Sequence, residues 1–173
     1  KSNYDLLILL GDRYEILSAA SSALIHNIPI AHIHGGETTL GAIDDSIRHS
    51  VTKMADIHFA SNKLHANRII QMGEDKRLVF NVGSLGVENI YKHKFLSRKE
   101  LEKKITTKLL KKNFMLTYHP VTKARKENLK PLIYALNFLL TIPSSKIFIS
   151  FPNADTFGNS IIDFLKEKFK KYP

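Results

Sequence analysis

The chain has 173 residues, 43% hydrophobic and 24% charged, so it can bury a core and is neither collagen-like, disordered nor a coiled coil. It contains no cysteine, which excludes a disulfide framework and a thiolate metal site and is typical of a reducing compartment such as the cytoplasm. The net charge of +10 arises in residues 86–173, where 18 Lys and Arg outnumber 7 Asp and Glu, and it favours anionic partners such as nucleic acid or a phosphorylated metabolite.

Six short apolar runs predict β-strands, and most are continuous, as in strands buried on both faces of a parallel sheet. They span residues 5–10, 28–34, 56–60, 78–82, 114–119 and 146–151. Stretches with helical periodicity lie between and after them, at residues 14–26, 44–54, 63–72, 127–140 and 160–172. This alternation predicts right-handed crossovers and an α/β fold with Rossmann-like parallel sheets. No apolar run approaches the ~20 residues that span a bilayer, so no membrane segment is expected.

The regular alternation of predicted strands and helices is interrupted in residues 83–113. A Lys-rich helix is predicted at 97–112, where Ser97 and Glu100 have the spacing of a capping box. We therefore expect the latter part of an N-terminal Rossmann-like lobe, an inter-lobe helix or linker, and the beginning of a C-terminal Rossmann-like lobe. Their predicted bounds are 1–90, 91–112 and 113–173. The first lobe is expected to lack its opening strands and the second its end, as in part of a longer protein.

Polar residues and glycines follow the predicted strands, at the edge where ligands bind in open α/β sheets. Asp12 comes directly after the first strand and is a candidate helix N-cap or a candidate catalytic carboxylate. His119, before a proline at the end of the fifth strand, is a candidate partner for a phosphate or a satisfied loop histidine.

His32 and His34 alternate along the second strand, so they are expected to point the same way. Such a pair can begin the metal site of a metal-dependent hydrolase, or it can combine a core-facing histidine with a neighbour of other function. Gly35 and Gly36 follow, and their bare amides are suited to holding a sugar or an anion.

The helix predicted at 44–54 carries opposite charges one turn apart. Asp44 precedes Arg48 by four residues, and Asp45 precedes His49 by four. These are either surface ion pairs or a carboxylate held beside cations and able to transfer a proton.

The lysines of the second half are interleaved with apolar residues on predicted helices. No aromatic-rich strand, zinc finger or recognition-helix pattern accompanies them, so solvated helix faces are the simplest interpretation. A basic module that binds nucleic acid or a nucleotide is the non-enzyme alternative.

Five strings in register resemble the hydrolysing UDP-N-acetylglucosamine 2-epimerase family, in its sialic-acid and legionaminic-acid pathway branch. They are residues 11–15 (GDRYE), 32–37 (HIHGGE), 43–49 (IDDSIRH) with Thr52 and Lys53, 119–122 (HPVT) and 151–155 (FPNAD). The resemblance covers the middle part of the family's length. It implies a two-domain fold of the glycosyltransferase-B type, only partly represented here, a cytoplasmic homodimer or higher oligomer, and no metal, nicotinamide, nucleic-acid or membrane partner.

The resemblance also implies a reaction in nonulosonic or sialic acid biosynthesis. UDP is eliminated across C1 and C2 of the sugar to give 2-acetamidoglucal, which is hydrated to N-acetylmannosamine. The implied catalytic residues are Asp12, Asp44, Asp45 and His119, and the implied substrate-binding residues are His34, Gly35, Gly36, Glu37, Arg48 and Asn153.

This chain departs from the family pattern at His34, where several relatives have a catalytic Glu. Either His34 takes over a proton role, or this branch performs the same chemistry on UDP-2,4-diacetamido-2,4,6-trideoxyglucose. The family's N-terminal Gly-Thr-Arg-Pro-Glu-like loop and its later uridine-binding segment have no counterpart, which predicts that residues 1–173 alone are inactive.

Overall fold

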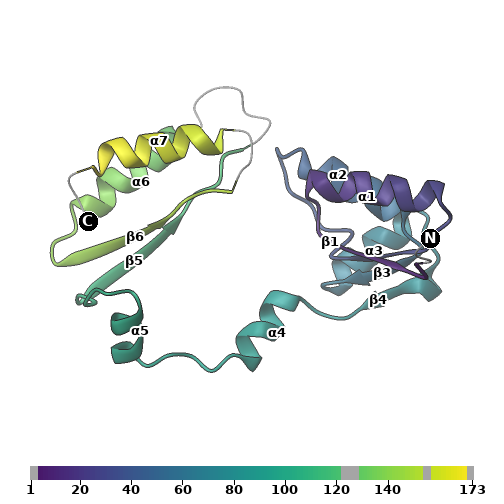
Figure 1. The fold of residues 1–173 in the computed structure, drawn as a ribbon, viewed down its shortest axis with the longest axis horizontal. Helices are drawn as coiled ribbons and strands as arrows, with labels where there is room; N and C mark the ends of the chain where they lie inside the picture. Colours follow the sequence, from purple (N-terminus) through teal and green to yellow (C-terminus); the bar gives the residue numbers. More distant parts are fainter. Residues whose placement is uncertain (1–3, 122–128, 154–156, 171–173) are drawn as a thin grey trace. The chain divides into compact units, whose positions relative to one another are not determined.

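The computed structural model describes residues 4–121, 129–153 and 157–170. Contacts between Cα atoms divide the chain into two compact units, Lys1–His93 and Lys94–Pro173. Each unit carries its own sheet (Figure 1). Residues 127–128 and 171–172, at the ends of two predicted helices, lie outside the described residues.

The first unit alternates strands and helices, as the sequence predicts. Its elements are β1 (Leu7–Leu10), α1 (Tyr14–Ile25), β2 (Ile30–Ile33), α2 (Asp44–Met54), β3 (Ile57–Ala60), α3 (Lys63–Gln71), a 3-10 turn (Lys76–Leu78), β4 (Val79–Asn81) and α4 (Leu85–Lys92). The strands are parallel in the order β1-β2-β3-β4, which confirms the predicted α/β class with a parallel sheet. The predicted ends of these strands and helices differ from the observed ends by at most two residues, except that α4 was not predicted as a helix.

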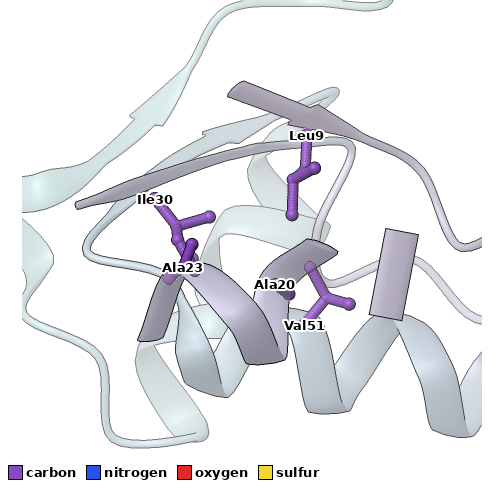
Figure 2. Packing of buried hydrophobic residues seen from close by; sticks show 6 residues of the cluster. Leu9, Ala20, Ala23, Ile30 and Val51 are labelled. Atoms are coloured by element: carbon purple, nitrogen blue, oxygen red, sulfur yellow. The ribbon is translucent and has the colours of Figure 1, made fainter. Parts of the chain in front are cut away.

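One face of this sheet packs against helices. Leu9 of β1 and Ile30 of β2 point toward Ala20 and Ala23 of α1 and Val51 of α2, and these buried side chains form the main core (Figure 2). A second cluster packs α3 on β3 and β4 through Ala60, Ala66, Ile69 and Val79. The strand register puts these strand residues on a single face of the sheet. Because each right-handed crossover advances to the next strand in the same direction, the crossover helices lie on that face too.

The opposite face is apolar and exposed in the described residues. Ile8 is 61% exposed, Leu10 52% and Phe80 44%, and the Phe80 ring stacks on Phe59 at 5.7 Å between centroids. The prediction of strands buried on both faces is therefore wrong for this part of the chain. The continuous apolar runs are real, but α1, α2 and α3 all pack on one side of the sheet.

The second unit has a two-stranded parallel sheet with two helices on one face (Figure 1). Its elements are α5 (Arg98–Lys104), β5 (Lys112–Thr117), α6 (Lys130–Leu140), β6 (Ser145–Ser150) and α7 (Gly158–Lys168). Leu132 and Leu136 of α6 meet Ile161 and Leu165 of α7 in its core.

The helix predicted at 97–112 is wrong beyond residue 104. The capping box of Ser97 and Glu100 forms as predicted, but α5 ends after about two turns. Thr106 takes a φ of 53°, and the Glu102 carboxylate accepts a hydrogen bond from the Leu109 N–H, which returns the chain toward β5. Among the described residues, no helix is long and apolar enough to cross a membrane.

Candidate functional site

Three polar residues follow adjacent strands at one edge of the first sheet. Asp12 follows β1 with one residue between them, His34 directly follows β2, and Ser61 directly follows β3. Backbone hydrogen bonds continue past the strand ends, from Gly11 N to Ile33 O at 3.0 Å and from His34 N to Phe59 O at 2.9 Å. The expected collection of polar groups at the carboxyl edge therefore exists in this unit.

Asp12 forms an ion pair with Arg48 of α2. The Arg48 side chain is 7% exposed and that of Asp12 is 23% exposed. The same Nη2 lies 3.2 Å from the Thr39 hydroxyl, whereas Nε and Nη1 are buried without a hydrogen-bond partner among the described residues. A buried guanidinium with two unpartnered nitrogens, which carry three N–H donors, can bind an anionic group. The N-cap interpretation of Asp12 is wrong, because Arg13 occupies the N-cap of α1 and makes no side-chain cap.

His32 of β2 connects Gly11, the residue after β1, to α2. It is fully buried, with Nε2 2.8 Å from the Gly11 carbonyl and Nδ1 3.1 Å from the Thr52 hydroxyl. Burial lowers the pKa of His32 to about 4, so the ring is neutral near pH 7. His32 holds Gly11, which precedes Asp12, and Thr52, which lies one turn beyond Arg48. It therefore acts as a scaffold for the Asp12–Arg48 pair.

The two glycines after β2 permit close packing around this scaffold. A Cβ on Gly35 would lie 3.0 Å from His32 Nδ1 and from Thr52 Oγ1. Gly36 has a φ of +74°, and a Cβ there would overlap the His65 carbonyl and lie 2.8 Å from Ile69 Cγ1. The Gly36 carbonyl also accepts a hydrogen bond from the Arg68 guanidinium. Gly36 therefore has a steric requirement for glycine, whereas a side chain at position 35 would require His32 and Thr52 to shift by a few tenths of an ångström.

His34 does not continue the alternation of β2. Its φ is 66°, so the chain leaves the strand here, and the expectation that His32 and His34 point the same way loses its basis. His34 Nδ1 instead lies 3.0 Å from Glu37 Oε1. Because both ring nitrogens of His32 are engaged within the fold, the pair does not form the predicted start of a metal site. In the described part of the chain, no three His, Cys, Asp or Glu residues are grouped to hold a metal.

The two aspartates at the start of α2 differ in their contacts. Asp45 Oδ1 accepts a hydrogen bond from the Thr39 N–H at 2.9 Å and lies 3.9 Å from His49 Nε2, as the spacing predicts. Asp44 makes no hydrogen bond or ion pair within the described ranges, because Arg48 turns to Asp12 instead. Asp45 thus anchors the loop before α2, whereas the Asp44 carboxylate is available to a ligand.

His119 and Asn153 belong to the second unit. They follow β5 and β6, whose ends pair at Thr117 and Ser150, so both lie beyond the same sheet edge, and both are exposed. Their position relative to the first unit stays a prediction. Thr122, Ala154 and Asp155 of the resembling strings lie outside the described residues. An apolar cavity of about 710 Å³ beside β6 is lined by none of the candidate residues.

Thr39 and His65 were missed by sequence reasoning. His65 Nδ1 lies 2.9 Å from the Ser61 hydroxyl, and Ser61 donates to Glu37 at 2.6 Å. The spacing of Ser61 and His65, four residues apart at the start of a helix after β3, is the signal that could have found His65. Thr39 lies in an irregular loop, where the sequence has no helical or strand periodicity from which the direction of a side chain could be predicted.

Comparison with known proteins identifies the family. Residues 1–172 match the family described as UDP-N-acetylglucosamine 2-epimerase. The chain is 43% identical over 167 residues to a Campylobacter jejuni protein named GDP/UDP-N,N'-diacetylbacillosamine 2-epimerase (hydrolyzing), covering 96% of this chain and 44% of that protein. It is 44% identical over 164 residues to the Escherichia coli polysialic acid biosynthesis protein P7, covering 93% of this chain and 41% of that protein.

A solved structure supports the fold assignment. The Methanocaldococcus jannaschii UDP-GlcNAc 2-epimerase in complex with UDP-GlcNAc and UDP aligns with a TM-score of 0.75 at 17% identity, over 97% of this chain and 47% of that one. The predicted glycosyltransferase-B-type α/β class is thereby confirmed. The chain spans less than half the length of these proteins. It belongs to the UDP-N-acetylglucosamine 2-epimerase family.

Proposed function

We propose that the protein is a hydrolysing 2-epimerase of a UDP-linked 2-acetamido sugar, with UDP-N-acetylglucosamine as substrate and N-acetylmannosamine as product. The observation that carries the proposal is the partly buried Asp12–Arg48 pair at the sheet edge, with Asp44, which has no partner among the described residues, one turn before Arg48 in α2. Arg48 can bind an anionic leaving group, and Asp44 can take a proton, and the reaction requires both functions. We place the reaction in nonulosonic or sialic acid biosynthesis.

The chemistry requires a base and a stabilised leaving group. The C2 proton of the sugar is not acidic, so departure of UDP from C1 must build positive charge on the ring while a carboxylate takes the proton. Asp44 is the residue that we assign to this proton transfer. We assign stabilisation of the diphosphate to Arg48, and the substrate-contacting roles of His119 and Asn153 stay what the family resemblance implies. Asp12 orients the guanidinium of Arg48 and is a further acid–base candidate.

A second substrate is supported by the name of a relative. The Campylobacter jejuni protein, 43% identical to this chain, is named a diacetylbacillosamine 2-epimerase. Its name supports UDP-2,4-diacetamido-2,4,6-trideoxyglucose as the alternative substrate for this chain. The bonds broken at C1 and C2 are the same for both sugars, so the candidate residues keep their roles. The two substrates differ in the groups at C4 and C6.

The test uses the full-length protein with each UDP-sugar in deuterated water. We expect UDP release and a free 2-epimer that carries deuterium at C2, because the proton removed from C2 is replaced from solvent. Asp44→Asn should abolish both, whereas Asp163→Asn, an exposed aspartate on α7, should leave both unchanged. A free product that retains protium at C2 would rule out the proposed elimination. The ratio of kcat/KM for the two sugars decides the substrate.

The two alternative functions, a metal-dependent hydrolase and a nucleic-acid-binding module, predict different experimental results for the full-length protein. A metal-dependent hydrolase would lose activity on chelation, and the engagement of both His32 ring nitrogens argues against it. A nucleic-acid-binding module would bind DNA or RNA with a steep dependence on salt. We propose that neither behaviour occurs.

A further inference from the structure

A network of polar contacts lies at the carboxyl end of α2, at the other end of this helix from Asp44. Lys53, in the last turn of α2, forms an ion pair with Glu74 and donates a hydrogen bond to the Met72 carbonyl at 3.2 Å. The other carboxylate oxygen of Glu74 lies 3.3 Å from Nε2 of His58 in β3. The network therefore connects α2 both to β3 and to the segment between α3 and β4.

The members of this network differ in burial. The side chain of His58 is 1% exposed and that of Glu74 is 14% exposed, whereas that of Lys53 is 52% exposed. The carboxylate thus lies between a buried ring and an ammonium group that reaches solvent. An ion pair with a half-exposed lysine contributes little to the free energy of unfolding. An effect of this pair on the position of α2 can therefore be measured separately from an effect on stability.

The apolar packing of α2 is small for a helix that carries candidate site residues. All residues of α2 are described, and Val51 is its one buried apolar side chain, with Ile47 and Met54 partly buried. The other buried residues are Arg48 and Thr52. Because apolar contacts are non-directional, they hold a helix on a sheet without fixing how far it slides or turns. The position of α2 along the sheet therefore depends on its directed polar contacts.

Two such contacts hold the last turn of α2. Thr52 Oγ1 lies 3.1 Å from His32 Nδ1 in β2 and donates to the Arg48 carbonyl at 2.8 Å. Lys53 makes the second contact through its network, toward a different part of the sheet. Together the two contacts restrain both sliding and rotation of the helix. Arg48 lies between one and two turns before Lys53, and Asp44 begins the same helix, so the restraint extends to both.

The proposed reaction depends on such a restraint. Misplacement of a reacting group by about 1 Å can lower a rate by about 10²-fold, even when the altered residue is far from the chemistry. We infer that Lys53 and Glu74 are positioning residues that hold Arg48 and Asp44 at the sheet edge through α2, without contacting the substrate. The inference rests on the proposed function, in which Arg48 stabilises the diphosphate and Asp44 removes the C2 proton.

The first test needs no substrate. The buried Nε–H of Arg48 gives an NMR signal that reports the surroundings of this side chain in the full-length protein. Lys53→Met keeps the length of the side chain but removes the ammonium group, so it should shift this signal. Lys76→Met, at an exposed lysine in the turn before β4, is the matched control and should cause no shift. An unchanged Arg48 signal in Lys53→Met would overturn the positioning role.

The second test measures kcat and KM for UDP release by the full-length protein. Lys53→Met and Glu74→Gln should each lower kcat by about tenfold or more, with a smaller change in KM. The double variant should be no slower than the slower single variant, because the two residues act through one contact. Lys53→Arg should retain most of the kcat, since a guanidinium can still donate to Glu74 and to the Met72 carbonyl. Lys76→Met should leave kcat unchanged.

Urea denaturation of the same variants separates positioning from stability. Because Lys53 is half exposed, its variants should stay folded under the conditions of the assay. A kcat that falls only in proportion to the folded fraction would overturn the inference, and so would an equal loss of kcat in Lys53→Arg and Lys53→Met. A wild-type protein that releases no UDP from either sugar would instead overturn the proposed function.

Discussion

The dependence of folding stability on pH tests the scaffold role of His32. Burial lowers the pKa of this ring from 6.5 to about 4, so the unfolded chain binds the proton more readily than the folded chain. The neutral ring therefore contributes its full stability above pH 6.5, and the contribution is lost as the pH falls from 6.5 toward 4. Between pH 7 and pH 5 the loss amounts to about 2 kcal/mol in the free energy of unfolding.

A variant without a titrating group isolates this contribution. His32→Gln can still donate an amide hydrogen to the Gly11 carbonyl, but it binds no proton in this range. Urea denaturation of the full-length protein, followed by circular dichroism at pH 7 and pH 5, gives the free energy of unfolding of each protein. The wild type should lose about 2 kcal/mol more than the variant, since all other groups titrate in both. Equal losses would refute a buried neutral His32.

Three further predictions concern the residues around this scaffold. Asp12→Ala should lower the free energy of unfolding, measured by urea denaturation, by about 3 kcal/mol because Arg48 stays buried and unpaired. Arg48→Met should lower it less, since Asp12 reaches solvent. Equal losses in the two variants would contradict this difference. Gly36→Ala should lower the free energy of unfolding by about 3 kcal/mol, because a Cβ would overlap the α3 backbone at a positive φ. Gly83→Ala, at a positive φ in open space, should lower it by about 1 kcal/mol. Equal losses in urea denaturation would show that the overlap at Gly36 has no effect. Asp45→Ala should raise KM several-fold because the loop before α2 is released, whereas Asp45→Asn keeps an acceptor oxygen and should retain activity in steady-state kinetics; loss of kcat in Asp45→Asn would assign this residue a proton role.

The strands and helices could be predicted because local patterns determine them. Apolar runs of strand length and helical periods found the strands of both sheets, and α2 has the predicted bounds. The sequence could not reveal that one sheet face is exposed, because an apolar run looks the same whether one or both faces are covered. The end of α5 was also missed, since it depends on a contact between Glu102 and Leu109 that no helical period reports.

The candidate site could be predicted only in part, because its geometry depends on contacts between distant residues. The placement of Asp12 after β1 followed from strand order. Its partner did not, since Arg48 has a carboxylate one turn before it in its own helix and pairs with one that is 36 residues away. Local spacing favours the nearby partner, but burial of the guanidinium against the sheet edge decides the actual one.

The two histidines after and within β2 show how backbone conformation divides the roles. His32 lies in the strand, faces the helices and uses both ring nitrogens within the fold, so it has none left for a substrate. His34 is two residues further along, but its φ of 66° takes it off the strand, and its ring contacts Glu37 through one nitrogen only. A histidine with one open nitrogen can form a hydrogen bond with a ligand, and one with both engaged cannot do so without breaking the fold. The same residue type on one short string therefore supplies the support in one position and a candidate substrate-binding group in the other.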